Sequence, residues 1–171
     1  MNLKQYKEHF NNIYDDEYNE QINALKEILP KNPHKIIELP ISKGLFFYVS
    51  SLITIDNEGL NISGNVEKLH KGNSYISYNE MNNDFNKPPE NHSFGRELRD
   101  KLSIYINIYT DPNLKVIPIL VLYSSGDKMK TTRLSNKSNV IDTREYDQCR
   151  ITFKVIGYGH FLLKSIKVRM F

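Results

Sequence analysis

Two tyrosines and one asparagine are the side chains of this sequence best suited to ligand chemistry. Tyr105, Asn107 and Tyr109 alternate within the run 102–109, so a strand would present all three on one face. A tyrosine ring offers its face to the C–H bonds of a sugar, and an amide both donates to and accepts from hydroxyl groups. The spacing predicts a sugar-binding surface; the alternative is that these rings pack under a helix or a loop.

A second alternating run, residues 150–155, carries two basic side chains on one face. Arg150 and Lys154 are separated by an even number of positions, so an extended strand places both on the same side. If this strand lies close to the first, the two side chains add hydrogen-bond donors to the predicted surface. The predicted ligand-binding residues are therefore Tyr105, Asn107, Tyr109, Arg150 and Lys154.

The sequence contains no motif for catalysis, for metal binding or for phosphate binding. None of the 5 histidines lies in an H-x-H or H-E-x-x-H arrangement, and none of the 20 acidic residues lies in a D-x-D-x-D-G calcium loop. The pair Gly157 and Gly159 is too short for a phosphate-binding loop, and Cys149 reads as a small half-buried thiol. We predict no catalytic residue, no metal and no cofactor. A glycosidase needs two carboxylates facing each other across a cleft, so a small glycoside hydrolase stays as an alternative.

Composition narrows the class of protein. The chain has 171 residues, with 23 basic and 20 acidic side chains spread along it, and this balance does not indicate nucleic-acid binding. No apolar run approaches the roughly 20 residues that span a bilayer, and the N-terminus is too polar for a signal peptide. A single cysteine excludes an internal disulfide and suits a reducing cytosol, so we expect a cytoplasmic protein.

The N-terminal part reads as helix. Between residues 3 and 29 apolar side chains recur at spacings of three and four, which is the helical period. Pro30 and Pro33 end this pattern. One bent helix and two short helices fit equally well. We expect a helical segment over 1–33 and a second unit over 34–171.

The second unit reads as strands. Alternating or β-branched runs predict strands within 44–56, 60–64, 74–78, 102–109, 116–123, 128–134 and 150–155, with a polar loop over 79–95. Within 116–123, Pro118 requires an edge position or a bulge. The segments 160–163 and 166–171 are expected to form a terminal hairpin after the glycine pair, with Lys164, Lys167 and Arg169 on its wet side.

These elements predict a mainly β fold, an antiparallel, jelly-roll-like β-sandwich preceded by the helical segment. Period-two patterns without crossover helices argue against a doubly wound parallel sheet. We expect one core that contains the apolar faces of the two clearest strands: Leu102, Ile104, Ile106, Ile108, Ile151, Phe153 and Val155.

Five stretches of the chain follow the strand rhythm of a known group of modules. The stretches are GLFFYVSSLITIDNEGLNISG at 44–64, SYISYNEMNNDF at 74–85, LSIYINIYTD at 102–111, VIPILVLYSSGDK at 116–128 and RITFKVIGYGHFLLKSIKV at 150–168. Residues 40–171 thereby resemble the β-sandwich carbohydrate-binding modules appended to bacterial cell-surface glycosyltransferases of the capsule and teichoic-acid type. The chain departs from such modules in having no tryptophan.

The resemblance implies a non-catalytic carbohydrate-binding domain that assists bacterial cell-surface polysaccharide metabolism. The implied partners are an oligosaccharide or surface polysaccharide and a glycosyltransferase, with no nucleic acid and no membrane span. The alternative reading is a protein–protein interaction domain that uses the helix or an exposed sheet edge as its contact.

Overall fold

The computed structural model describes residues 33–48, 53–56, 61–66, 74–80, 82–90 and 98–171, and for 61–66 it describes the backbone alone. The helical segment expected over residues 3–29 lies outside the described residues. So does the loop beyond residue 90 that the sequence placed in 79–95.

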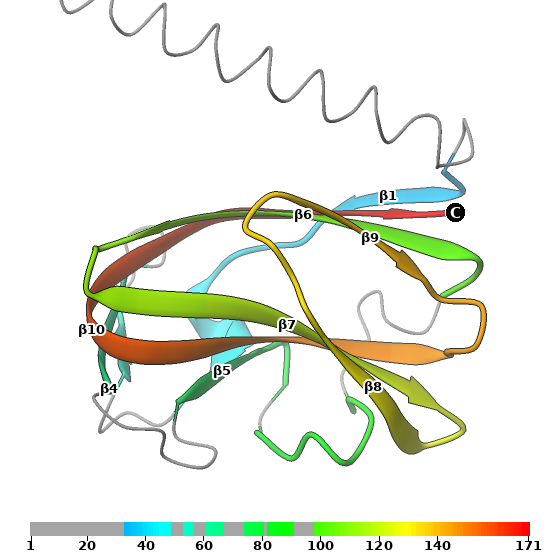
Figure 1. Ribbon diagram of the computed structural model, residues 1–171, viewed down its shortest axis with the longest axis horizontal. Coiled ribbons are helices and arrows are strands. Elements are labelled where there is room, and N and C mark those ends of the chain that lie inside the picture. Colours follow the sequence, from blue (N-terminus) through cyan, green and yellow to red (C-terminus); the bar gives the residue numbers. More distant parts are fainter. Residues whose placement is uncertain (1–32, 49–52, 57–60, 67–73, 81, 91–97) are drawn as a thin grey trace, which may run out of the picture.

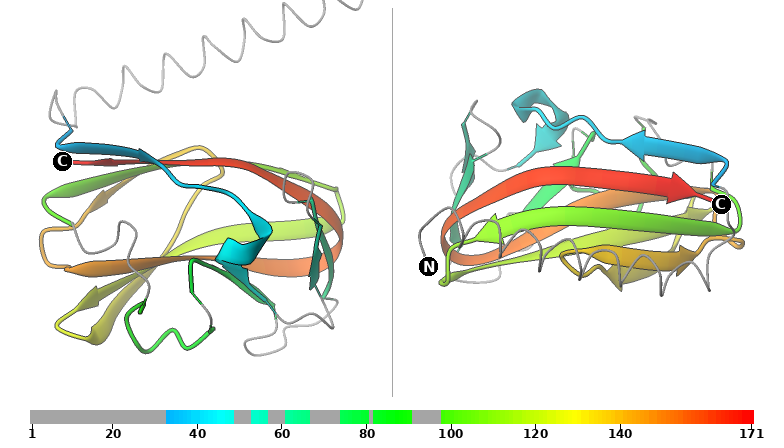
Figure 2. Two further views of the ribbon diagram at one scale, coloured as in Figure 1. Left: turned by 180° about the vertical axis from the view of Figure 1, so that it is seen from behind. Right: turned by 90° about the horizontal axis from the view of Figure 1, so that it is seen from above.

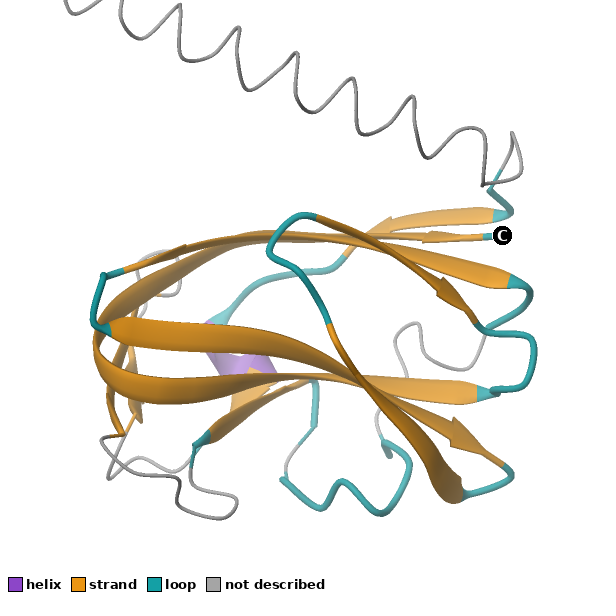
Figure 3. Cartoon of the chain, viewed as in Figure 1, coloured by secondary structure: helices purple, strands orange, loops and turns teal. Residues whose placement is uncertain are grey.

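The described chain is mainly β, as predicted. Ten strands form one hydrogen-bonded sheet in which every pairing is antiparallel. The helix within these residues is a three-residue 3-10 turn, η1 (Lys43–Leu45) (Figure 3). The strands are β1 (Lys35–Glu38), β2 (Phe46–Phe47), β3 (Ile53–Ile55), β4 (Asn61–Val66), β5 (Tyr75–Tyr78), β6 (Lys101–Thr110), β7 (Leu114–Ser124), β8 (Asp127–Arg133), β9 (Ser138–Asp142) and β10 (Gln148–Met170).

The last strand organises the whole sheet, and it corrects the sequence prediction. β10 runs without a break over 23 residues, so the expected terminal hairpin is wrong. Gly157 and Gly159 have φ values of +98° and +137°, which only glycine adopts easily. A Cβ at Gly157 would lie 2.2 Å from the carbonyl oxygen of Asn113. The glycines therefore bend the strand instead of reversing it.

The bend gives β10 two sets of neighbours. Its first half pairs with β7 and β5, and its second half pairs with β6, β4 and β1. β8 extends the first half beyond β7, and β9 extends the second half beyond β6. The sheet thus folds over at β10, and its two halves face each other (Figures 1 and 2). We call them the β7 layer and the β6 layer.

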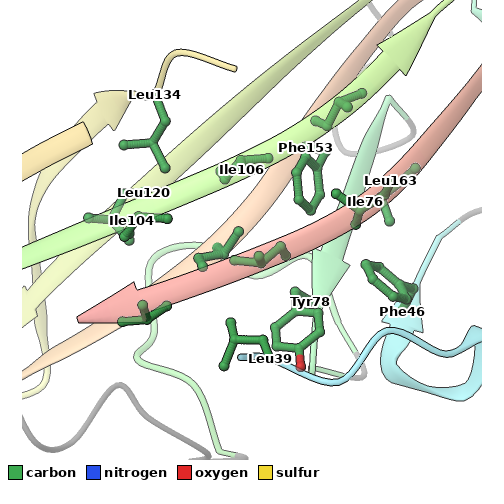
Figure 4. Close-up of a cluster of buried hydrophobic side chains, with 14 of the residues drawn as sticks. Leu39, Phe46, Ile76, Tyr78, Ile104, Ile106, Leu120, Leu134, Phe153 and Leu163 are labelled. Atoms are coloured by element: carbon green, nitrogen blue, oxygen red, sulfur yellow. The ribbon is translucent and has the colours of Figure 1, made fainter. Parts of the chain in front are cut away.

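The apolar core fills the space between these layers (Figure 4). β6 alternates strictly between buried and half-buried residues from Lys101 to Ile108. All seven side chains predicted for the core belong to the same buried cluster, which confirms that part of the prediction. Burying isoleucine, valine and phenylalanine side chains stabilises the fold by about 1.5–3 kcal/mol each.

Pro118 sits where a strand interior can accept proline. It lies inside β7, opposite Phe153 of β10. Its carbonyl accepts a hydrogen bond from the Leu134 amide, on the side of β8, whose ladder ends one residue away at Ile119. The proline nitrogen faces the same side, because the N–H and C=O of one strand residue point the same way. The missing donor therefore falls at the end of a ladder.

Two of the strands, β1 and β9, were not predicted from the sequence. β1 and β9 are short edge strands that pair with β10 and β6 respectively. Next to β9, the Asn136 side chain accepts from the Ile108 amide at 2.8 Å and donates to the Ile108 carbonyl at 2.7 Å. Asn136 and Ile108 are 28 residues apart, so the residues within β9 show no pattern that would predict the strand.

Candidate functional site

The predicted aromatic surface lies on the outward side of the β6 layer. Tyr105, Asn107 and Tyr109 alternate with the core-facing isoleucines of β6, so all three side chains share one face. Tyr109 is 51% exposed, and Tyr105 and Asn107 are half-buried. The two tyrosines lie about 13 Å apart along the strand, at roughly 3.3 Å per residue.

Basic side chains of β10 lie beside these residues. Lys167 is the direct neighbour of Tyr105 across the ladder, and Arg169 is the neighbour of Ser103. Both side chains are exposed. Figure 2 (right) looks onto this layer, with the second half of β10 next to β6. We call the surface formed by Tyr105, Asn107, Tyr109, Lys164, Lys167 and Arg169 the tyrosine face.

Lys164 reaches this face because of an irregularity in β10. The ladder to β6 shifts register between Leu163 and Ser165, which leaves Lys164 as an extra residue. A bulge of this kind re-aims the side chain that it carries. The Lys164 ammonium lies 4.4 Å from the centroid of the Tyr109 ring, within cation–π range. The sequence predicted the three basic side chains on the wet side of a terminal hairpin; they lie on the outward side of β10 instead, beside the tyrosines, which the sequence did not predict.

Arg150 belongs to the other layer. It lies on the outward side of β10's first half, across from Val121 of β7, and is only 2% exposed. Its guanidinium donates to the carbonyl of Asn82 at 3.1 Å and to that of Lys87 at 3.2 Å. The structure therefore does not bring Arg150 to the tyrosine face, and it ties down the described loop 82–90 instead.

Lys154 shares that outward side of the β7 layer. Its ammonium lies 5.8 Å from the centroid of the Tyr75 ring. Tyr75 in turn packs edge-on against Phe85 of the loop, with centroids 5.0 Å apart. The sequence predicted that Arg150 and Lys154 would join the tyrosine surface if residues 150–155 lay beside residues 102–109. Residues 150–155 pair with β7 instead, and a later part of the same strand pairs with β6. The two strands meet different parts of the sheet, so the five predicted residues divide between two faces.

The loop over the β7 layer is held by several contacts. The Tyr123 hydroxyl donates to the Phe85 carbonyl at 2.9 Å, and the Ser77 hydroxyl donates to the Asn83 side chain at 2.6 Å. A small apolar cluster of Ile119, Val121 and Tyr123 lies on this side of β7. Burial raises the pKa of Tyr123, so its hydroxyl stays a donor at neutral pH and above it. The loop 82–90 therefore covers the outward side of the β7 layer at Arg150.

The pKa values of Cys149 and Asp111 also depart from their usual values. Complete burial raises the pKa of the Cys149 thiol to about 12, so it stays protonated at neutral pH and is a poor nucleophile. Asp111 accepts from the His160 amide at 2.8 Å, and this hydrogen bond holds the pKa of the exposed Asp111 carboxyl below its usual value. Within the described ranges, no group of three or more His, Cys, Asp or Glu residues is placed to hold a metal ion.

The described residues also contain no helix that is long and apolar enough to cross a membrane. The fold and the face together define an antiparallel β module with an aromatic and basic sheet surface. No protein-family model and no curated protein matches the sequence.

Several solved structures resemble the chain at low sequence identity. The chain is similar to one chain in a crystal structure of accessory secretory proteins 1, 2 and 3 of Streptococcus pneumoniae, with 10% identity, a TM-score of 0.55, and coverage of 76% of this chain and 99% of that one. At this identity the likeness is one of fold.

Two further structures resemble the chain. One belongs to the glycosylation-associated protein complex of Streptococcus agalactiae, with 11% identity, a TM-score of 0.49, and coverage of 78% of this chain and 44% of that one. The other is a carbohydrate-binding module of BiXyn10A, with 11% identity, a TM-score of 0.45, and coverage of 82% of this chain and 93% of that one.

Proposed function

We propose that this chain is a non-catalytic carbohydrate-binding module and that its folded-over sheet is a jelly-roll-like β-sandwich. The observation that carries the proposal is the pair Tyr105 and Tyr109 on one outward face, with Asn107 between them. A pair of rings about 13 Å apart spans more than one sugar ring. The ligand is therefore an oligosaccharide or a surface polysaccharide.

We further propose that the module serves as one subunit of an assembly. The fold likeness to an entire chain of the three-component accessory secretory structure supports this, since 99% of that chain is covered. In this view it presents a glycan to a glycosyltransferase or another partner in bacterial cell-surface polysaccharide metabolism. A cytoplasmic location remains a prediction from the single cysteine.

The test compares two exposed tyrosines. In Tyr109→Ala a stacked ring is lost, so affinity for the best ligand of an oligosaccharide array should fall by about 0.5–1.5 kcal/mol. Tyr158→Ala is the matched control, because Tyr158 is 56% exposed and lies at the bend of β10, outside the tyrosine face. It should bind like the parent. Calorimetric titration of both variants measures the difference. Equal affinities of the two variants would contradict the proposal that the tyrosine face binds the oligosaccharide.

A protein-interaction subunit is the second candidate. The likeness to a chain of a multi-protein structure favours it as much as it favours a glycan-binding subunit. The two candidates separate on the array: a folded chain that binds no glycan of any kind supports the interaction subunit and contradicts the sugar-binding proposal.

A further inference from the structure

The tyrosine face carries more positive than negative charge. Lys164, Lys167 and Arg169 are all exposed on β10. The carboxylate next to them is Glu38 of β1, which is the ladder neighbour of Lys167 on the other side of β10. In the part of the chain that the structure describes, no ion pair is formed by any of the three cations.

Three carboxylates lie near the two ends of β6, and Asp100, which directly precedes the strand, lies near Arg144 and not near the three cations. Asp111 accepts hydrogen bonds from His160. Asp142, the neighbour of Lys101, forms an ion pair with Arg144, and this contact lowers the Asp142 pKa to about 2. Asp111 keeps its negative charge, because its hydrogen-bond partners are an amide and a histidine ring, whereas the charge of Asp142 is paired with Arg144. Lys164, Lys167 and Arg169 still outnumber Glu38 and Asp111, so the face retains an excess of positive charge beside its aromatic rings.

We propose that the ligand of the tyrosine face is an anionic glycan chain, whose sugar rings stack on the tyrosines and whose charged groups pair with Lys164, Lys167 and Arg169. This inference rests on the proposed carbohydrate-binding function and names its ligand class. Carboxylate and phosphodiester groups share the required chemistry, because both accept charge-assisted hydrogen bonds from lysine and arginine.

The geometry suits a chain that lies along the strands. Lys167 and Arg169 project on the same side two strand steps apart, about 6.6 Å, and run parallel to the line from Tyr105 to Tyr109. The bulge at Lys164 adds a third cation at the Tyr109 end. Aromatic and cationic rows thus lie side by side, which matches a polymer that carries both apolar ring faces and repeated charges.

The central comparison uses two oligosaccharides with the same sugar backbone, one charged and one neutral. Oligogalacturonate and the same oligomer in fully methyl-esterified form are titrated into the full chain by calorimetry, at low and at high salt. A phosphodiester-linked glycan oligomer tests the other charged group, and polyglutamate tests a polyanion without sugar. We expect a charged glycan to bind at least about tenfold more tightly than the ester at low salt, and the difference to shrink as salt screens the charges.

Two triple variants make the matched control. Lys164→Gln, Lys167→Gln and Arg169→Gln together remove the cations of the face. Lys128→Gln, Lys130→Gln and Arg133→Gln remove three exposed cations of β8, in the other layer. Each exposed contact contributes up to about fivefold in affinity. The first triple variant should therefore lose most of the preference for the charged glycan, and the second should keep it with an unchanged melting temperature.

The outcomes separate this inference from the proposed function. If the methyl ester binds as tightly as the acid and Tyr109→Ala weakens both, the face binds neutral sugar and the charge inference is wrong while the function stands. If no glycan binds, or polyglutamate binds as tightly as the charged glycans and Tyr109→Ala changes nothing, both the inference and the function fail. Equal losses in the two triple variants also overturn the inference.

Discussion

At the scale of residues, two basic side chains of one strand have different roles. Arg150 and Lys154 share a face of β10, but Arg150 is buried under the loop 82–90 and Lys154 is half-buried beside Tyr75. Guanidinium groups offer several donors in a fixed plane, which allows Arg150 to serve two loop carbonyls and to lie 5.6 Å from the centroid of the Phe85 ring. Arg150 thus stabilises the loop and is remote from the tyrosine face.

Replacing these two residues by methionine should separate the roles. Arg150→Met leaves two loop carbonyls without a charged donor, so we expect the free energy of unfolding to fall by about 1–3 kcal/mol. Lys154→Met removes one cation–π contact and should cost less than about 1 kcal/mol. Urea denaturation measures both, and limited proteolysis should cut the loop faster in Arg150→Met. Equal stability of the two variants would contradict the assignment of Arg150 as the residue that anchors the loop.

At the scale of elements, the glycines of β10 decide whether the chain folds over. Gly157 combines a positive φ with a carbonyl oxygen 2.2 Å from the position of a Cβ. Gly126, in the turn between β7 and β8, has a similar φ of +89° but no atom within 4 Å of that position. Both glycines have a backbone conformation that would strain any other residue but only Gly157 is crowded, so comparing the two positions separates the cost of crowding from the cost of strain.

Alanine at each position should reveal this difference. Gly126→Ala bears backbone strain alone, about 1–3 kcal/mol. Gly157→Ala bears the same strain and must also displace the Asn113 carbonyl, which adds about 1–3 kcal/mol by analogy with overpacking. Thermal denaturation of the two variants gives the comparison. A Gly157→Ala protein as stable as Gly126→Ala would show that the bend tolerates a side chain.

At the scale of the whole molecule, β10 makes the two layers interdependent. One half of this strand belongs to the β7 layer and the other half to the β6 layer, and a single apolar cluster joins them. Neither layer can separate from the other without exposing that cluster. We therefore expect the described unit to unfold as one cooperative body.

A core substitution in each layer tests the cooperativity. Ile104 of β6 and Leu120 of β7 are both fully buried, so Ile104→Ala and Leu120→Ala should each lower the free energy of unfolding by about 2–5 kcal/mol. Each variant should still unfold in one transition, with far-ultraviolet circular dichroism and tyrosine fluorescence coinciding. A variant that melts in two steps would show that the layers are independent units.

Local pattern alone determined which side chains of β6 face the core. The alternation of Leu102 to Tyr109 has a period of two, and it is a property of neighbouring residues, so it survives any choice of partner strand. The predicted core and the shared side of Tyr105, Asn107 and Tyr109 followed directly, and the structure agrees with both.

The bend of β10, the burial of Arg150 and the position of Lys164 were decided by the tertiary structure, because each depends on a partner that is distant in the sequence. Glycines between two strands permit a turn or a bend, and the contact between Gly157 and Asn113, far away in sequence, favours the bend. Arg150 is buried because the loop at Asn82 folds over it, and Lys164 reaches Tyr109 because the ladder shifts register. These outcomes are set by packing between segments that are distant along the chain, and no window of sequence contains both partners.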